Sequence, residues 1–236
     1  MSVQQPAIVE LIGPAGAGKS TLLRALRAQV QQLPSSNRPL GFFTDRLPAR
    51  DPQNLPFYLM SGLRTFPTLL RLLGQGATLR REELSRLLYL QGMPAYFTHH
   101  RMAAHPTLVD QGPIFELTHL QAFGSATLHT PAMRGWWAAR YQRWAPLLAM
   151  VIWLDAPDAV LIPRIQARNQ DHIIKALSPA AAAEVLARYR RSFTTVMTAL
   201  QQHVPLPVLH IRTDETEVAA LVTQVLENPA VGSNLS

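Results

Sequence analysis

The chain has 236 residues, of which 47% are hydrophobic and 16% are charged, and it contains no cysteine. This composition suits one globular domain with a sizeable core, and it excludes disulfides and thiolate metal sites. No apolar run is long enough to cross a bilayer, and the N-terminus lacks a signal-like segment, so we expect a cytoplasmic protein with no membrane contact.

The formal net charge of +7 comes from arginine, because the chain has 20 arginines and only 2 lysines. Guanidinium groups pair well with phosphate and carboxylate. The arginines are scattered along the chain, and the usual nucleic-acid-binding motifs are missing. The charge therefore favours a small anionic substrate over nucleic acid.

A glycine-rich loop lies between a buried strand, residues 8–12, and a helical pattern in residues 19–30. Its sequence is Gly13-Pro14-Ala15-Gly16-Ala17-Gly18-Lys19-Ser20-Thr21, which contains the Walker A pattern. Loop N–H groups and the helix N-terminus form a cradle for anions. We expect Lys19 to reach the β- and γ-phosphates of a nucleotide and the Ser20 hydroxyl to hold Mg²⁺. A glycine-rich turn that binds nothing is the alternative.

Strands and helices alternate after this loop. We expect strands in residues 39–48, 105–115, 147–157 and 207–214, a closing helix over 215–227, and a frayed tail over 228–236. Residues 57–105 are mainly helical by period, with breaks at Pro67, near Gly74–Gly76 and at Gly92–Pro94. This order predicts a single α/β domain with a three-layer, doubly wound parallel sheet of about five strands and its site at the carboxyl ends of the strands.

Three aspartates follow the apolar strands and can converge on one crevice. Asp110 is the best candidate for a carboxylate that orients Mg²⁺ through water or accepts the proton of the attacking group; capping of the next helix is its alternative. For Asp155 a capping or structural role is favoured. Asp45 either faces the acceptor or pairs with Arg46 or Arg50.

The segment over residues 155–177 carries four basic or titratable groups at helical spacing: Arg164, Arg168, His172 and Lys175. On one helix they would share a face and repel one another unless an anion joined them. The period therefore predicts a short helical lid over 160–178, with a solvated basic face as the alternative.

Residues 151–168, VIWLDAPDAVLIPRIQAR, together with the Walker A loop, resemble the P-loop nucleoside and nucleotide kinase superfamily. In that superfamily a strand ending in an acid-proline turn precedes a helix with Arg-x-x-x-Arg. The layout is similar to that of thymidylate kinases, as is ARYRRSF at 187–193. The resemblance implies ATP and Mg²⁺ as cofactors, with Arg164 nearer the adenine or phosphates and Arg168 on the transferred phosphoryl group.

The acceptor half departs from the family patterns. Thymidylate kinases have Asp-Arg-aromatic where this chain has Asp110-Gln111-Gly112, and the Glu-Arg-Ser of deoxynucleoside kinases is missing. We expect an acceptor lobe formed by residues 57–105 and the helix over 134–144. The aromatic residues of that helix either sandwich a flat ring or, as we favour, pack in the core. Asp45, Arg46 and Gln111 are the candidate acceptor residues.

Two classes of function remain. The first is a kinase that phosphorylates a nucleoside monophosphate, a nucleoside, or a non-nucleotide metabolite or antibiotic. The second is a P-loop NTPase regulator without an acceptor. The lid arginines favour the first class, and a homodimer is compatible with it. The excess of arginine favours a monophosphate acceptor, whose phosphate would be bound by Arg46, Arg64 and Arg101. The alternative is an acceptor with a free hydroxyl, bound by Asp45, Asp110 and Gln111.

Overall fold

A five-stranded parallel sheet forms the centre of the computed structural model, which describes residues 8–34, 38–43, 55–74, 79–99 and 106–232. The strand order is β2-β3-β1-β4-β5, and every neighbouring pair is parallel. The strands are β1 (Ile8–Ile12), β2 (Gly41–Phe43), β3 (Thr107–Asp110), β4 (Leu148–Asp155) and β5 (Val208–Arg212). The predicted α/β fold with a doubly wound sheet is confirmed.

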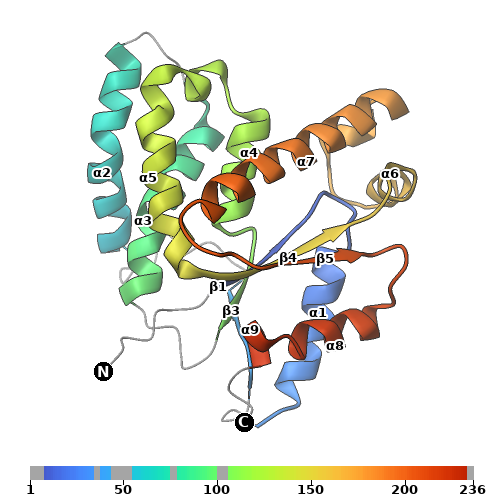
Figure 1. The fold of residues 1–236 in the computed structure, drawn as a ribbon. Helices are drawn as coiled ribbons and strands as arrows, with labels where there is room; N and C mark the ends of the chain where they lie inside the picture. Colours follow the sequence, from blue (N-terminus) through green and yellow to red (C-terminus); the bar gives the residue numbers. More distant parts are fainter. Residues whose placement is uncertain (1–7, 35–37, 44–54, 75–78, 100–105, 233–236) are drawn as a thin grey trace.

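Alternate residues of the central strand β1 face two separate hydrophobic cores. Ile8 and Ile12 pack against the helices on one face of the sheet, and Val9 and Leu11 pack against those on the other. Helices α2 (Leu55–Gly74), α3 (Arg81–His99), α4 (Pro113–Phe123) and α5 (Arg134–Trp144) gather on the first side (Figure 1).

Four further helices contribute to the core on the second side of the sheet. They are α1 (Lys19–Gln31), α6 (Asp158–Gln166), α8 (Val218–Leu226) and α9 (Pro229–Gly232). The long helix α7 (Pro179–Gln201) contributes residues to both cores. Short 3₁₀ turns at 126–129, 131–133, 145–147 and 173–176 connect these elements. No helix in the described ranges is long and apolar enough to cross a membrane.

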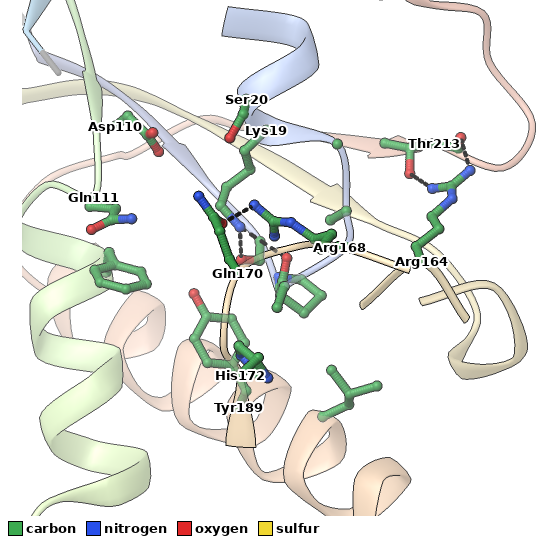
Figure 2. A pocket seen from close by; sticks show the side chains of 18 of the residues that line it. Lys19, Ser20, Asp110, Gln111, Arg164, Arg168, Gln170, His172, Tyr189 and Thr213 are labelled. Atoms are coloured by element: carbon green, nitrogen blue, oxygen red, sulfur yellow. Dashed lines mark hydrogen bonds between the residues drawn. The ribbon is translucent and has the colours of Figure 1, made fainter. Parts of the chain in front are cut away.

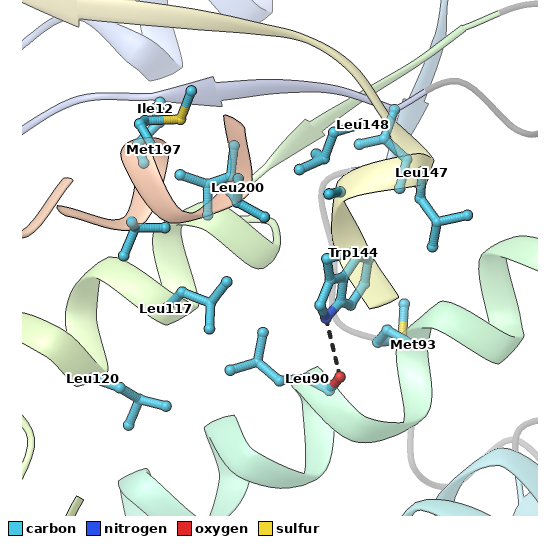
Figure 3. Packing of buried hydrophobic residues seen from close by; sticks show 14 of the residues in the cluster. Ile12, Leu90, Met93, Leu117, Leu120, Trp144, Leu147, Leu148, Met197 and Leu200 are labelled. Atoms are coloured by element: carbon cyan, nitrogen blue, oxygen red, sulfur yellow. Dashed lines mark hydrogen bonds between the residues drawn. The ribbon is translucent and has the colours of Figure 1, made fainter. Parts of the chain in front are cut away.

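Two of the breaks expected in the helical region are wrong, because Pro67 lies inside α2 and Pro94 inside α3. Proline in a helix lacks the N–H that would donate to the carbonyl four residues earlier. In α3 that carbonyl belongs to Leu90, and it accepts a hydrogen bond from Trp144 Nε1 at 3.0 Å instead (Figure 3). A side chain from α5 therefore replaces the missing donor, and α3 continues.

The C-terminal helix also corrects an expectation. Residues 229–232 form α9, and Val231 is fully buried against the second core, so this part of the chain is packed rather than frayed. The expected strand over 39–48 is described only as far as Phe43; Asp45, Arg46 and Arg50 lie outside the described residues.

Replacing Trp144 with Phe should leave the Leu90 carbonyl without a donor in the core. We expect the free energy of unfolding to fall by about 1–3 kcal/mol, the cost of an unsatisfied buried polar group. Pro94→Ala restores the N–H of residue 94, so Trp144→Phe should be less damaging in a Pro94→Ala background. Urea unfolding of the four proteins measures this, and equal losses in both backgrounds would contradict the compensation.

Candidate active site

The Walker A loop is tightly fixed between β4 and α6. Gly13 has a φ of +155°, and a Cβ there would lie 2.1 Å from the backbone oxygen of Leu154. Gly16 has a φ of +81°, and its Cβ would lie 3.0 Å from the oxygen of Leu161. Glycine is required at both positions, because the backbone conformation and the close approach exclude a side chain. The loop is therefore held in one shape before it meets a ligand.

The ammonium group of Lys19 folds back over this loop. It donates hydrogen bonds to the carbonyls of Gly13 at 2.6 Å and Pro14 at 2.9 Å. Burial, assisted by nearby Arg168, lowers its pKa to about 8, and the charge of Asp110 opposes this shift. A phosphate bound beside Lys19 would stabilise the charged ammonium and would therefore raise its pKa again.

A pocket of about 990 Å³ extends from the loop along the carboxyl edge of the sheet. All nine loop residues, Gly13 to Thr21, line it. So do Asp110, Gln111, Arg164 and Arg168, which come from β3, the turn after it, α6 and the segment after α6 (Figure 2). The structure therefore brings together every described residue that the sequence nominated for the donor and catalytic roles.

Asp110 ends β3 beside β1 and carries an unpaired buried oxygen. Its Oδ1 is shielded from water and has no hydrogen-bond partner. Burial raises its pKa, while the Lys19 charge and the Gln111 backbone N–H oppose the rise. Gln111 has a φ of +56°, the single positive value of a non-glycine residue in the described part of the chain. Such a strained turn after a strand is common at functional sites.

The capping interpretation of Asp110 is wrong, because another carboxylate receives the N–H groups of α4. Glu10, fully buried in β1, accepts hydrogen bonds from the backbone N–H groups of Ile114 and Phe115, both at 2.8 Å. Burial raises the pKa of Glu10 to about 8, although these two N–H groups oppose the shift. The sequence offered one signal for this residue, a charge inside an apolar strand, which the sequence-based prediction did not use.

Asp155 has the structural role that the sequence favoured. Arg190 on α7 donates to both of its carboxylate oxygens, at 2.8 and 3.0 Å, and to Asp158 at 2.7 Å. The Ala156 N–H also donates to Asp155 at 2.8 Å. These bonds tie α7 to the end of β4 and the start of α6. Nothing in the sequence pattern identified Arg190 as the partner.

The expected continuous lid helix is interrupted. Helix α6 ends at Gln166, an irregular stretch follows, and a 3₁₀ turn covers 173–176. His172 is the N-cap of that turn, since its Nδ1 accepts the Ile174 N–H at 3.2 Å. Side chains at 169–172, Asn-Gln-Asp-His, bond to nearby backbone more readily than they support a helix. The four charged groups therefore do not share one helix face.

Within this segment the two arginines point in different directions (Figure 2). Arg164 donates to the hydroxyl and carbonyl oxygens of Thr213, at 3.1 and 3.3 Å, on the far side of the pocket. Arg168 lies nearer Lys19 and donates to Gln170 at 2.7 Å. Both remain beside the pocket, but only Arg168 contributes to the low pKa of Lys19.

Helix α4 supplies an aromatic row that the sequence-based prediction missed. Phe115, His119 and Phe123 recur one turn apart, line the pocket, and have successive ring centroids 6.1 and 5.1 Å apart. Burial and the charges of Arg86 and Arg80 lower the pKa of His119 to about 4, so the imidazole is neutral at physiological pH. The four-residue spacing of these aromatic side chains, which is typical of one helix face, is the sequence signal that could have identified the row.

The aromatic residues of α5 pack in the core, as the favoured interpretation held. Trp144 is fully buried, and Trp137 donates its Nε1–H to the Leu128 carbonyl at 2.8 Å. None of the residues that the structure describes in α5 lines the large pocket. Asp45 and Arg46, the other nominated acceptor residues, lie outside the described ranges, whereas Gln111 points into the pocket (Figure 2).

Comparison with known proteins agrees with this architecture. No protein-family model and no curated protein sequence matches the chain. Among solved structures, the thymidylate kinase of Candida albicans has a TM-score of 0.54 at 12% identity, covering 98% of this chain and 94% of its own. The deoxyadenosine kinase of M. mycoides, solved with bound dATP, has a TM-score of 0.52 at 12% identity, covering 92% and 96%.

A third similar structure is the YorR protein of Bacillus subtilis in complex with phosphorylated GDP, with a TM-score of 0.50 at 11% identity over 93% of this chain and 94% of that chain. At this level of identity the likeness concerns the fold. The chain has the fold of the P-loop nucleoside and nucleotide kinases, as the sequence resemblance predicted.

Glu10 should make the protein less stable as the pH rises. Its folded pKa of about 8 exceeds its ordinary value of 4.5, so the folded chain keeps a proton that the unfolded chain releases. This contribution is complete below pH 4.5 and is lost as the pH rises through 8. Between about pH 7 and 8, where most of the histidine titration around 6.5 is over, the free energy of unfolding should fall by up to about 1.4 kcal/mol per pH unit.

Denaturant unfolding at several pH values measures this slope. Glu10→Gln is expected to be less stable overall, because its amide presents N–H to one of the two backbone donors, but its slope should be flatter. Glu184→Gln, which removes an exposed carboxylate paired with Arg191, is the control and should keep the wild-type slope. An unchanged slope in Glu10→Gln would contradict the assignment.

Proposed function

We propose that this protein is an ATP-dependent kinase that transfers the γ-phosphoryl group to a nucleoside or a nucleoside monophosphate. One observation carries the proposal: a single pocket joins the Walker A loop to Asp110, Gln111 and the aromatic row of α4. A nucleotide switch or regulator needs a phosphate loop, but it has no need of a second, ring-lined compartment beside it.

The donor half follows from the loop. Its N–H groups and the start of α1 favour phosphate oxygens, and Gly18, the residue before α1, makes no side-chain cap that would compete for them. Lys19 would exchange the Gly13 and Pro14 carbonyls for β- and γ-phosphate oxygens. The ammonium then neutralises charge in the transition state.

The oxygen donors at the site fit Mg²⁺. Ser20 is exposed at the start of α1, and Asp110 has an unpaired carboxylate oxygen, both of which are hard ligands of the type that Mg²⁺ takes. Ser20 would hold the ion directly and Asp110 through water. The ion would supply charge neutralisation at the phosphates.

Asp110 is the proposed general base. Its raised pKa makes the carboxylate a better proton acceptor than an exposed aspartate, and its free oxygen faces no competing donor. With a nucleoside acceptor, the hydroxyl would lose its proton to Asp110 as its oxygen bonds to the γ-phosphorus and the bond to the β-phosphate oxygen breaks. With a monophosphate acceptor, an ionised phosphate oxygen would form the same bond, and no base would be needed. Gln111, held beside it by the strained turn, would orient the acceptor.

The arginines after β4 would complete the phosphate site. Arg168, whose charge already affects Lys19, would contact the transferred phosphoryl group, and Arg164, bound to Thr213, would face the adenine end of ATP. We propose that residues 160–178 act as a lid, since residues 166–173, between the buried anchors Ile165 and Ile174, are exposed.

The acceptor side favours a flat ring. Phe115, His119 and Phe123 present aromatic faces and edges, and a neutral imidazole can donate or accept a hydrogen bond to a base without repelling it. The similar structures named for thymidylate and deoxyadenosine kinases support the same substrate class. We also propose a cytoplasmic location, which would supply ATP and such acceptors.

An acceptor panel tests the proposal. Purified protein with Mg²⁺ATP should phosphorylate at least one member of a set of nucleosides and nucleoside monophosphates, measured as ADP formation and product mass. Lys19→Ala should lose this activity while keeping its melting temperature within about 2 °C. ATP hydrolysis that no acceptor stimulates would contradict the kinase proposal and favour an NTPase regulator.

Asp110→Asn separates chemistry from binding. The amide cannot accept the proton of a nucleoside hydroxyl, so kcat with a nucleoside acceptor should fall by about 10²-fold or more while ATP affinity changes little. Glu184→Gln, at an exposed position of α7 that is not part of the pocket lining, is the matched loss of a carboxylate and should keep full activity. Full activity in Asp110→Asn with a lowered melting temperature would assign the residue a structural role instead.

A further inference from the structure

Three arginines in the helical lobe form a group apart from the nucleotide pocket. Arg64 is on α2, Arg140 and Arg143 are on α5, and both helices pack against α3 (Figure 1). Burial lowers the pKa of Arg140 to about 10, and the charges of Arg143 and Arg64 add to this shift. None of the three lines the large pocket. Like charges have thus been placed close to one another outside the proposed active site.

These arginines have no acidic partner in the described part of the chain. The ion pairs that the structure shows there involve other arginines: Arg80, Arg86, Arg190, Arg191 and Arg212. Helix α2 contains no acidic residue, and neither does α5. Their mutual repulsion is therefore not balanced by any carboxylate of these two helices.

Arg140 is buried, and two of its three guanidinium nitrogens are unpaired. The residue is 7% exposed, and its Nε and Nη1 are shielded from water without a partner. Its guanidinium carbon lies 5.6 Å from the centre of the Trp136 ring. The indole Nε1 of Trp136 is also buried and unpaired. Three donors and no acceptor thus lie within one turn of α5.

A buried guanidinium without a counterion is strongly disfavoured, and unpaired buried donors add to the penalty. The ring of Trp136 compensates only in part, because a cation–π contact satisfies no N–H group. Because all of these groups are hydrogen-bond donors, they cannot coordinate a metal cation. They require a ligand that only accepts hydrogen bonds. Guanidinium forks match the oxygens of phosphate in geometry and charge.

We propose that Arg64, Arg140 and Arg143, with the indole N–H of Trp136, bind a phosphate-type oxyanion between α2 and α5, at a site separate from the nucleotide pocket. The ligand is inorganic phosphate or the phosphate group of a monoester. By contacting Arg64 on one helix and Arg140 on the other, the anion ties α2 to α5. Binding therefore stabilises the helical lobe and slows local opening of α2.

Hydrogen–deuterium exchange locates this binding and separates it from phosphate at the Walker A loop. The full-length Lys19→Ala variant, whose loop binds phosphate less tightly, is compared in about 10 mM sodium phosphate and in sodium chloride of equal ionic strength. We expect exchange in residues 55–74 and 134–144 to slow by about threefold or more in phosphate. Protection confined to residues 13–31, or no protection, would overturn the proposal.

Matched variants on α5 test the residues. Arg140→Met, which keeps the apolar stem against Trp136, should abolish the protection, whereas Arg134→Met, which removes an exposed arginine of the same helix, should keep it. Should Arg140→Met fail to fold, Arg64→Gln/Arg143→Gln alters two less buried members and should weaken phosphate binding by about tenfold. Equal protection in the arginine-site variants and wild type would overturn the proposal.

A second arm identifies the source of the phosphate group. Glycerol 3-phosphate replaces inorganic phosphate in the same exchange experiment, and half-protection at a lower concentration would assign the site to a monoester. Half-protection at a lower concentration of inorganic phosphate would assign it to the free ion. Either result supports the oxyanion site, and neither depends on the kinase activity proposed above.

Discussion

The buried carboxylate of Glu10 fixes the position of the pocket's two halves relative to each other. It lies in β1, which runs directly into the Walker A loop, and it accepts the first free N–H groups of α4, which carries the aromatic row. The Walker A loop and the helix that carries the aromatic row are thus linked through one side chain. These two N–H groups, at the positive end of the α4 dipole, oppose the rise in the pKa of Glu10 that its burial causes.

The same contact explains a glycine that would otherwise have no role. A Cβ at Gly112 would lie 2.8 Å from the carboxyl carbon of Glu10 and 2.9 Å from a methyl group of Val109. A side chain there would push α4 away from β1 and disrupt both hydrogen bonds. The short sequence Asp110-Gln111-Gly112 therefore combines a free carboxylate, a strained turn and a position where only glycine fits.

The local parts of this molecule could be predicted from the sequence, and the long-range contacts could not. The Walker A loop is specified by adjacent residues, so its glycines, Lys19 and Ser20 are recognisable from the amino-acid pattern alone. Glu10 and its α4 partners are more than 100 residues apart, and no periodic pattern connects them. Pro94 shows the same limit, because its helix continues through a donor from Trp144, 50 residues later. The sequence pattern predicted a helix break at Pro94, but the hydrogen bond from Trp144 to the Leu90 carbonyl allows the helix to continue.

Two carboxylates on neighbouring strands of this sheet are both withdrawn from water and serve different purposes. Glu10 is satisfied by two backbone donors and holds α4 in place, whereas Asp110 keeps an oxygen unpaired at the pocket. Leu11 is paired in register with Asp110, so the two acids lie close enough for the charge of Asp110 to raise the pKa of Glu10. If Glu10 keeps its proton and is neutral, Asp110 can ionise without repulsion from a second negative charge. The structural acid thereby favours ionisation of the proposed base, because two adjacent buried carboxyls do not both ionise readily.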